Sequence, residues 1–102
     1  MYLFNTTFYI DDAVIGDWRE WLRTIYIPMM QAAGTFSNPL VYRVHSLNDE
    51  EGSSSIAVQF TVQTMDDIRL WNDAISQRVE QSMLGAFGTK VLHFWAVLEP
   101  LS

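Results

Sequence analysis

The chain has 102 residues, enough for one domain with a modest hydrophobic core, so we treat residues 1–102 as a single domain. Apolar residues make up 49% of the sequence and charged residues only 18%, below the roughly 25% charged that is typical of soluble domains. A domain this small cannot bury that much apolar surface by itself. The composition therefore predicts a partner, and the simplest partner is a second copy of the chain.

The charge and the cysteine count exclude several classes of function. The net charge is −6, with twelve acidic against six basic residues, which disfavours nucleic acid and anionic membrane surfaces as partners. There is no cysteine, so a disulfide framework and a thiolate metal site are excluded. A leader pattern and a run of about 18 apolar residues are also missing, so we expect a cytoplasmic protein that does not span a membrane.

The first two predicted elements are a strand over residues 2–10 and a long amphipathic helix. Asp11 and Asp12 can cap this helix, which runs to about Ala33, and Gly34 can end it by taking a positive φ. The apolar positions of the helix recur at spacings of three and four, as one face of a helix requires. These positions are Val14, Trp18, Trp21, Leu22, Ile25, Met29 and Ala33.

Pro28 is the irregular residue of this helix. It has no N–H to offer the carbonyl of Thr24, and its ring presses against that carbonyl. We therefore expect a kink here. The kink either lets the helix follow a twisted sheet or leaves one carbonyl free for water, a side chain or a ligand.

The rest of the chain is predicted to hold three strands and one helix. Residues 37–39 predict a turn, followed by strands over residues 40–47 and 55–62. A second helix begins at the capping residue Thr64 and closes at two glycines, and residues 89–98 form the last strand.

The order strand, helix, strand, strand, helix, strand defines the fold class. Each strand–helix–strand unit should be a right-handed crossover. This order predicts an α+β fold, the ferredoxin-like βαββαβ sandwich, in which a four-stranded antiparallel sheet carries two helices on one face. The first and third strands are central in this arrangement.

One face of this sheet has no helix left to cover it. Both faces of the strands at 40–47 and 89–98 are apolar, so their phase is the less determined part of the assignment. The predicted face is too apolar to be left in water, so we expect a second copy to cover it by isologous pairing into a dimeric α/β barrel. Alternation places on it Leu3, Asn5, Thr7, Tyr9, Val41, Arg43, His45, Ala57, Gln59, Thr61, His93, Trp95 and Val97.

Several short motifs occur together in a fixed order along nearly the whole chain. They are Trp18-x-x-Trp21-Leu22, Ile27-Pro28, Gly34-x-Phe36, Tyr42-Arg43, a strand with Gln59, and Phe87-Gly88. In this pattern the chain resembles the uncharacterised bacterial DUF4286 domain family. The resemblance implies the ferredoxin-like dimer and no activity, because none is assigned to the family. The family is expected to have a histidine where this chain has Tyr26.

The polar residues of the uncovered face suggest a small ligand. A guanidinium such as that of Arg43 on a covered face must be paired, either with a carboxylate or phosphate of an anionic ligand or with an acid of the protein. The amides of Asn5 and Gln59 either orient a ligand or satisfy each other. The candidate ligand-binding residues are Asn5, Thr7, Arg43, Gln59, His93 and Trp95.

Metals and cofactors are not expected. His45 and His93 belong to opposite edge strands, roughly 14 Å apart at about 4.8 Å per strand, so they cannot share a metal within one chain. His93 is either a general base beside Trp95 or a hydrogen-bonded edge histidine. Asn5 and Trp71 are similar to a pair in small haem-degrading enzymes of this architecture, but the second helix lacks an axial histidine, which argues against haem.

The acidic segment over residues 48–54 has two interpretations. It can be a solvated hairpin loop, or Asp49, Glu50 and Glu51 can form a cation site. The alternating ligand pattern of an EF-hand loop is missing, so the solvated loop is the prediction.

These residues support three functional hypotheses. The first is a homodimer that binds a small anionic or aromatic molecule. The second is an enzyme similar to the cofactor-free monooxygenases and isomerases of this architecture, in which His93 or Tyr26 moves a proton; this rests on fold analogy. The third is a purely structural dimer whose interior is filled by side chains.

Overall fold

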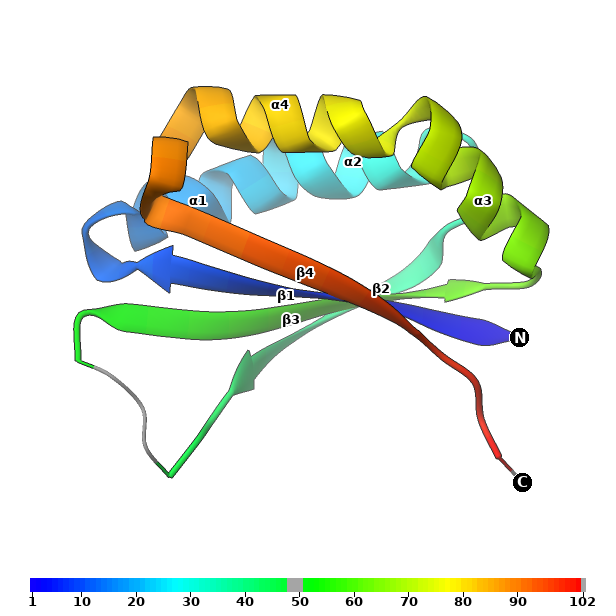
Figure 1. Ribbon diagram of the computed structural model, residues 1–102, viewed down its shortest axis with the longest axis horizontal. Coiled ribbons are helices and arrows are strands. Elements are labelled where there is room, and N and C mark those ends of the chain that lie inside the picture. The colour runs from blue at the N-terminus through cyan, green and yellow to red at the C-terminus, as the bar shows by residue number, and fades with distance from the viewer. Residues whose placement is uncertain (48–50, 102) are drawn as a thin grey trace.

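The computed structural model describes residues 1–47 and 51–101 of the chain. The elements of the first half are β1 (Tyr2–Asp11), a 3-10 turn (Asp12–Val14), α1 (Ile15–Trp21), a π-helical turn (Leu22–Tyr26), α2 (Ile27–Gln31) and β2 (Ser37–Val44) (Figure 1). Those of the second half are β3 (Ser53–Val62), α3 (Met65–Ala74), α4 (Ser76–Phe87), a 3-10 turn (Gly88–Lys90) and β4 (Val91–Leu98).

The described strands form one antiparallel four-stranded sheet in the order β2-β3-β1-β4, and the helices all lie on one side of it (Figure 1). This is the α+β fold with the ferredoxin-like βαββαβ order of elements, as the sequence predicts. The central strands β1 and β3 pair over their whole length, from Tyr2 opposite Val62 to Asp11 opposite Ser53.

The hydrophobic core lies between the sheet and the helices. Phe4, Phe8 and Phe60 project from the central strands and have no exposed surface. The ring centroid of Phe8 lies 5.3 Å from that of Tyr26, and that of Phe4 lies 4.8 Å from that of Trp71, both with the edge-to-face geometry that aromatic pairs favour. The sequence assigned the alternate residues Leu3, Asn5, Thr7 and Tyr9 to the uncovered face, and the burial of Phe4 and Phe8 against the helices agrees with that assignment.

The irregularity expected at Pro28 takes the form of a π-helical turn just before it. The N–H of Ile27 donates to the carbonyl of Leu22, five residues back, and Pro28 then falls in the first turn of α2, where its missing N–H is tolerated. The extra residue shifts the buried face by one position. Ile25, predicted to face the core, is 41% exposed, whereas Tyr26 is buried at 1%.

The second predicted helix is broken in two at Ile75, whose φ of −121° lies outside the helical range. The hydroxyl of Ser76 donates to the carbonyl of Asn72 at 2.6 Å, one turn back. Serine hydroxyls that bond in this way bend helices. The prediction of a single helix here is therefore wrong, and α3 and α4 meet at a bend.

Strand β2 has the opposite phase from the one predicted. Arg43 lies directly opposite Ile56, which belongs to the helix-side core, and opposed residues of a strand pair share a face. The cause is an irregularity between Ser37 and Leu40, where Asn38 takes a φ of 51° and the predicted turn joins the strand. A shift of one residue moves every side chain to the other face.

Strand β4 is also reversed. His93 lies opposite Phe8 and Trp95 lies opposite Thr6, so both face the helices. The two alternate sets of β4 are both apolar, and the one that includes Trp95 faces the core: the Trp95 ring centroid lies 5.2 Å from that of Phe4. The residues wrongly assigned to the uncovered face are Val41, Arg43, His93, Trp95 and Val97.

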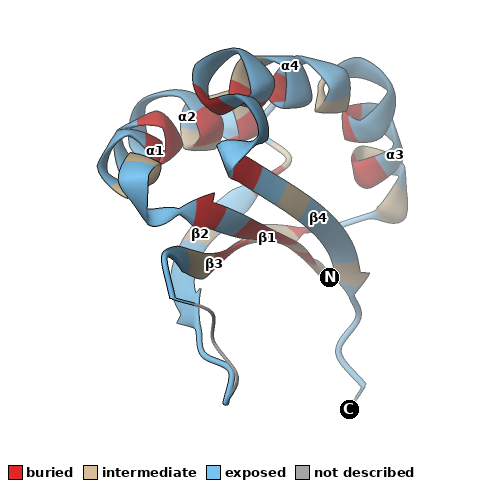
Figure 2. Cartoon of the chain, turned by 60° about the vertical axis from the view of Figure 1, so that its left-hand side comes forward, coloured by how far each residue is buried: buried red, intermediate tan, exposed pale blue. Residues whose placement is uncertain are grey.

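We call the side of the sheet that faces away from the helices the open face. The assignments of Leu3, Asn5, Thr7, Tyr9, Ala57, Gln59 and Thr61 to this face are confirmed by the strand pairing. The loop ends of β2 and β3 and the C-terminal segment extend past the sheet on this side and give it the shape of an arch (Figure 2). The apolar residues exposed on it are Tyr9, Leu40, Tyr42, Val44, Leu92, Phe94 and Leu98.

Candidate functional site

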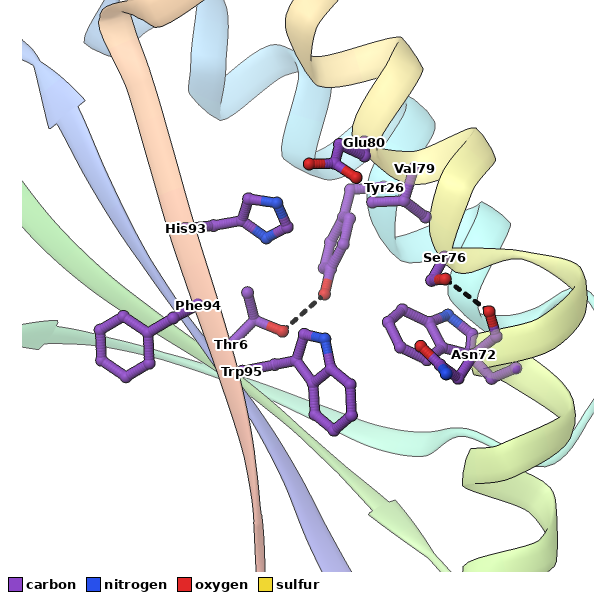
Figure 3. Close-up of a pocket in the computed structure, with 10 residues that line it drawn as sticks. Thr6, Tyr26, Asn72, Ser76, Val79, Glu80, His93, Phe94 and Trp95 are labelled. Atoms are coloured by element: carbon purple, nitrogen blue, oxygen red, sulfur yellow. Dashed lines mark hydrogen bonds between the residues drawn. The ribbon is translucent and has the colours of Figure 1, made fainter.

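A pocket of about 370 Å³ opens between the edge strand β4 and the helices α3 and α4 (Figure 3). It lies on the helix side of the sheet, within one protomer. The residues of its wall that matter for chemistry are Thr6, Tyr26, Trp71, Glu80, His93 and Trp95.

Two hydroxyls form the floor of the pocket. The Tyr26 hydroxyl donates to the Oγ1 of Thr6 at 3.2 Å, and both side chains are buried. Burial raises the pKa of Tyr26 well above its usual range, and the hydrogen bond to Thr6 offsets only part of this rise. Tyr26 therefore stays protonated and neutral at every physiological pH.

The π-helical turn explains how Tyr26 reaches this position. One extra residue in a helical turn rotates the residues after it by about 100° around the axis. The rotation turns Ile25 outward and Tyr26 and Met30 inward. The sequence suggested Tyr26 for proton transfer, but its periodicity did not place this residue at the floor of a pocket. Pro28, two residues later, was the only signal that the helical period would slip.

His93 forms one wall. Its ring stacks on Phe8, with centroids 5.8 Å apart and planes 16° from parallel. Burial lowers the pKa of His93 below its usual 6.5, and the carboxylate of Glu80 on α4 raises it by a smaller amount. The imidazole is therefore neutral at pH 7 and can accept a proton.

The opposite end of the pocket is aromatic. The ring centroids of Trp71 and Trp95 lie 5.6 Å apart, edge to face. The indole N–H of Trp71 donates to the sulfur of Met30 at 2.9 Å, which fixes that ring, while Trp95 remains 39% exposed. Figure 3 shows Glu80 and His93 toward one end, Trp95 toward the other and Tyr26 between them, with the ring of Phe94 turned away.

The six candidate residues predicted from the sequence do not form one site. His93 and Trp95 line the pocket, whereas Arg43 lies exposed on β2, the opposite edge strand. The other three lie on the open face, where Asn5 is directly opposite Gln59 and its amide N–H donates to the Oγ1 of Thr7 at 3.3 Å. The Oδ1 of Asn5 is buried without a hydrogen-bond partner among the described residues.

Two of the three acids of the candidate cation loop, Asp49 and Glu50, lie outside the described residues. Within residues 1–47 and 51–101, the structure contains no group of three or more histidine or acidic side chains placed to hold a metal ion. No helix in that part of the chain is long and apolar enough to cross a membrane.

The fold and the pocket define the class of protein: a ferredoxin-like α+β domain with a polar and aromatic pocket between its edge strand and its helices. The chain belongs to the DUF4286 family, a domain of unknown function whose profile matches residues 1–101. The family description assigns no activity. A comparison with curated proteins gave no match.

Proposed function

We propose that this domain binds a small organic molecule in the pocket between β4 and the helices α3 and α4. The observation that carries the proposal is the composition of the wall: two indoles at one end, with His93, Glu80 and the Tyr26–Thr6 hydroxyl pair as polar partners. Small-molecule sites have this mixture of apolar surface and a few convergent polar groups, in volumes of about 300–1,000 Å³. The volume of about 370 Å³ suits a molecule of one or two rings.

The wall argues against the anionic ligand that the sequence suggested. Arg43 is on the far edge of the sheet, and among the described residues that line the pocket none is lysine or arginine. An anion would meet the carboxylate of Glu80 with no compensating cation. The expectation of an aromatic ligand remains, because Trp95 offers a partly exposed ring.

The test compares the binding of small molecules to the wild type with their binding to a variant whose pocket is blocked. We would screen small one-ring and two-ring fragments by ligand-observed NMR, after native mass spectrometry of the freshly purified protein for any retained molecule. Ser76 is a half-buried pocket residue, so Ser76→Phe should fill the cavity, whereas Gln77→Phe adds the same ring at an exposed neighbouring position. Binding that is lost only in Ser76→Phe supports the proposal. Binding of equal strength to the two variants contradicts the proposal. Absence of binding to the wild type and to both variants contradicts it as well.

We also propose that two copies pair through the open face. Seven large apolar side chains are exposed on it, on three of its strands. Asp11, at the end of β1, is the only charged residue on this face among the described strand residues. A patch that pairs with its own copy must complement itself, and copies with a net charge of −6 can approach most easily through uncharged surface. The polar row of Asn5, Thr7 and Gln59 would meet its symmetry mate at the centre.

Proton transfer is a second candidate function for the same pocket. It is favoured by one observation: a neutral imidazole, at His93, shares the cavity with a protonated phenol, at Tyr26. The first can accept a proton, and the second can donate a hydrogen bond to the charge that forms once its O–H turns from Thr6 to the ligand. A bound fragment with an acidic C–H should exchange it for solvent deuterium faster in the wild type than in His93→Gln. Equal exchange rates would remove this candidate.

A further inference from the structure

The charge distribution of the pocket narrows the chemistry of its ligand. Glu80 is the only charged residue lining it in the described part of the chain, and it makes no ion pair there. The ion pairs that the structure shows, Glu20 with Arg23 and Asp66 with Arg69, lie elsewhere on the helix surfaces. At neutral pH the pocket therefore carries one uncompensated negative charge.

Among the described residues, no other side chain of the wall opposes a cation. The His93 ring is neutral above its lowered pKa, and Tyr26 is neutral throughout. The whole molecule adds to the effect, because a net charge of −6 attracts cations at long range. At the other end, the indoles of Trp71 and Trp95 present apolar, electron-rich surface that favours flat apolar groups and nearby cations.

We propose that the ligand is a small organic amine with an aromatic or flat apolar body. Its ammonium group lies at the Glu80 end, within reach of that carboxylate, and its body lies against Trp95. This inference rests on the proposed small-molecule site and adds the chemical class of the ligand.

An inorganic cation fits the site less well than an amine. Ca²⁺ and Mg²⁺ need several oxygen ligands, and the pocket offers one carboxylate with hydroxyl and amide groups spread along its length. An ammonium group needs only one carboxylate and water, and the apolar body supplies the remaining affinity.

The test uses three probes that share one body and differ in charge: 2-phenylethylamine, 2-phenylethanol and phenylacetate. Binding is followed by NMR titration of the protein at low salt. The amine should bind up to about fivefold more tightly than the alcohol, the usual range for one partly exposed ion pair, and the acid should bind more weakly than both. Glu80→Gln should remove the preference of the protein for the amine, measured as the ratio of the dissociation constants of the alcohol and the amine.

Glu51→Gln is the matched control, since it removes one negative charge from an exposed position near the start of β3 and should keep the preference. Equal binding of amine and alcohol, or a preference that survives Glu80→Gln, overturns the amine assignment while leaving the small-molecule site intact. If no probe binds but other fragments occupy the pocket, the amine assignment alone fails. If no probe and no fragment binds, both proposals fail.

Discussion

The two faces of the sheet are built from the same strands and have opposite characters. On the helix side, Phe4, Phe8 and Phe60 are completely buried in an aromatic core. On the open face, Tyr42, Leu92 and other large side chains remain 40–59% exposed around a polar centre. The covered face carries the buried core of the chain. The open face leaves large apolar side chains exposed, and it is the surface on which the proposed association depends.

The largest expected effect comes from truncation on the covered face. Phe8→Ala removes a ring that contacts Trp18, Tyr26 and His93 and leaves a cavity, so unfolding free energy should fall by about 3–5 kcal/mol. Phe94→Ala on the open face, measured by urea unfolding at the lowest workable protein concentration, should cost less than about 1 kcal/mol. Similar losses of unfolding free energy in the two variants would show that the two faces contribute equally to the stability of the chain.

The second prediction concerns association. Phe94→Asp puts a charge on the open face. The dissociation constant for self-association should be higher in this variant than in the wild type, on the order of thirtyfold or more. Leu84→Asp is the control, because Leu84 is similarly exposed but lies on α4, away from this face. Sedimentation equilibrium measures the dissociation constant of each variant. A wild-type chain that stays monomeric at high concentration would end the pairing proposal.

The two faces also separate what the sequence could predict from what it could not. In the central strand β1, Phe4 and Phe8 lie on one side and the polar Asn5 and Thr7 on the other, so its phase was determined. The edge strands are apolar on both sides. In β4, Phe94 looked as suitable for the core as Trp95, and only the register with β1 separates them. Edge phase depends on a bulge or a turn, which sequence periodicity does not contain.

The pocket could not be predicted from the sequence for a related reason. It requires Tyr26 to turn inward, which depends on a π-helical turn, and it requires His93 to face the helices, which depends on the β4 register. Each is a slip of one residue against a regular period. The element order and the open sheet face survive such slips, and were therefore predicted from the sequence. A site assembled from β1, the π-helical turn, α3, α4 and β4 does not survive them.

The third prediction tests the floor of the pocket. Tyr26→Phe removes the hydrogen bond to Thr6 and should lower stability by about 1 kcal/mol near pH 7. Because burial raises the folded-state pKa of Tyr26 above 10.0, the unfolded chain releases this proton first as the pH rises. The wild type should therefore lose stability above about pH 10 more steeply than Tyr26→Phe. If the stabilities of the two proteins, measured by urea unfolding, fall in parallel as the pH rises, Tyr26 is not buried as the structure indicates.

The smallest expected effect is the acid dependence at His93. Its pKa is lowered in the folded protein, so below pH 6.5 the unfolded chain takes up a proton before the folded chain does. Stability should be highest above that pH, decline as the pH falls toward the folded-state pKa, and level off below it. His93→Gln should flatten this part of the profile, and His45→Gln, at the exposed end of the opposite edge, is the control variant. If both variants keep the wild-type slope, His93 is not shielded on the covered face, and the neutral base assigned to the pocket is lost with it.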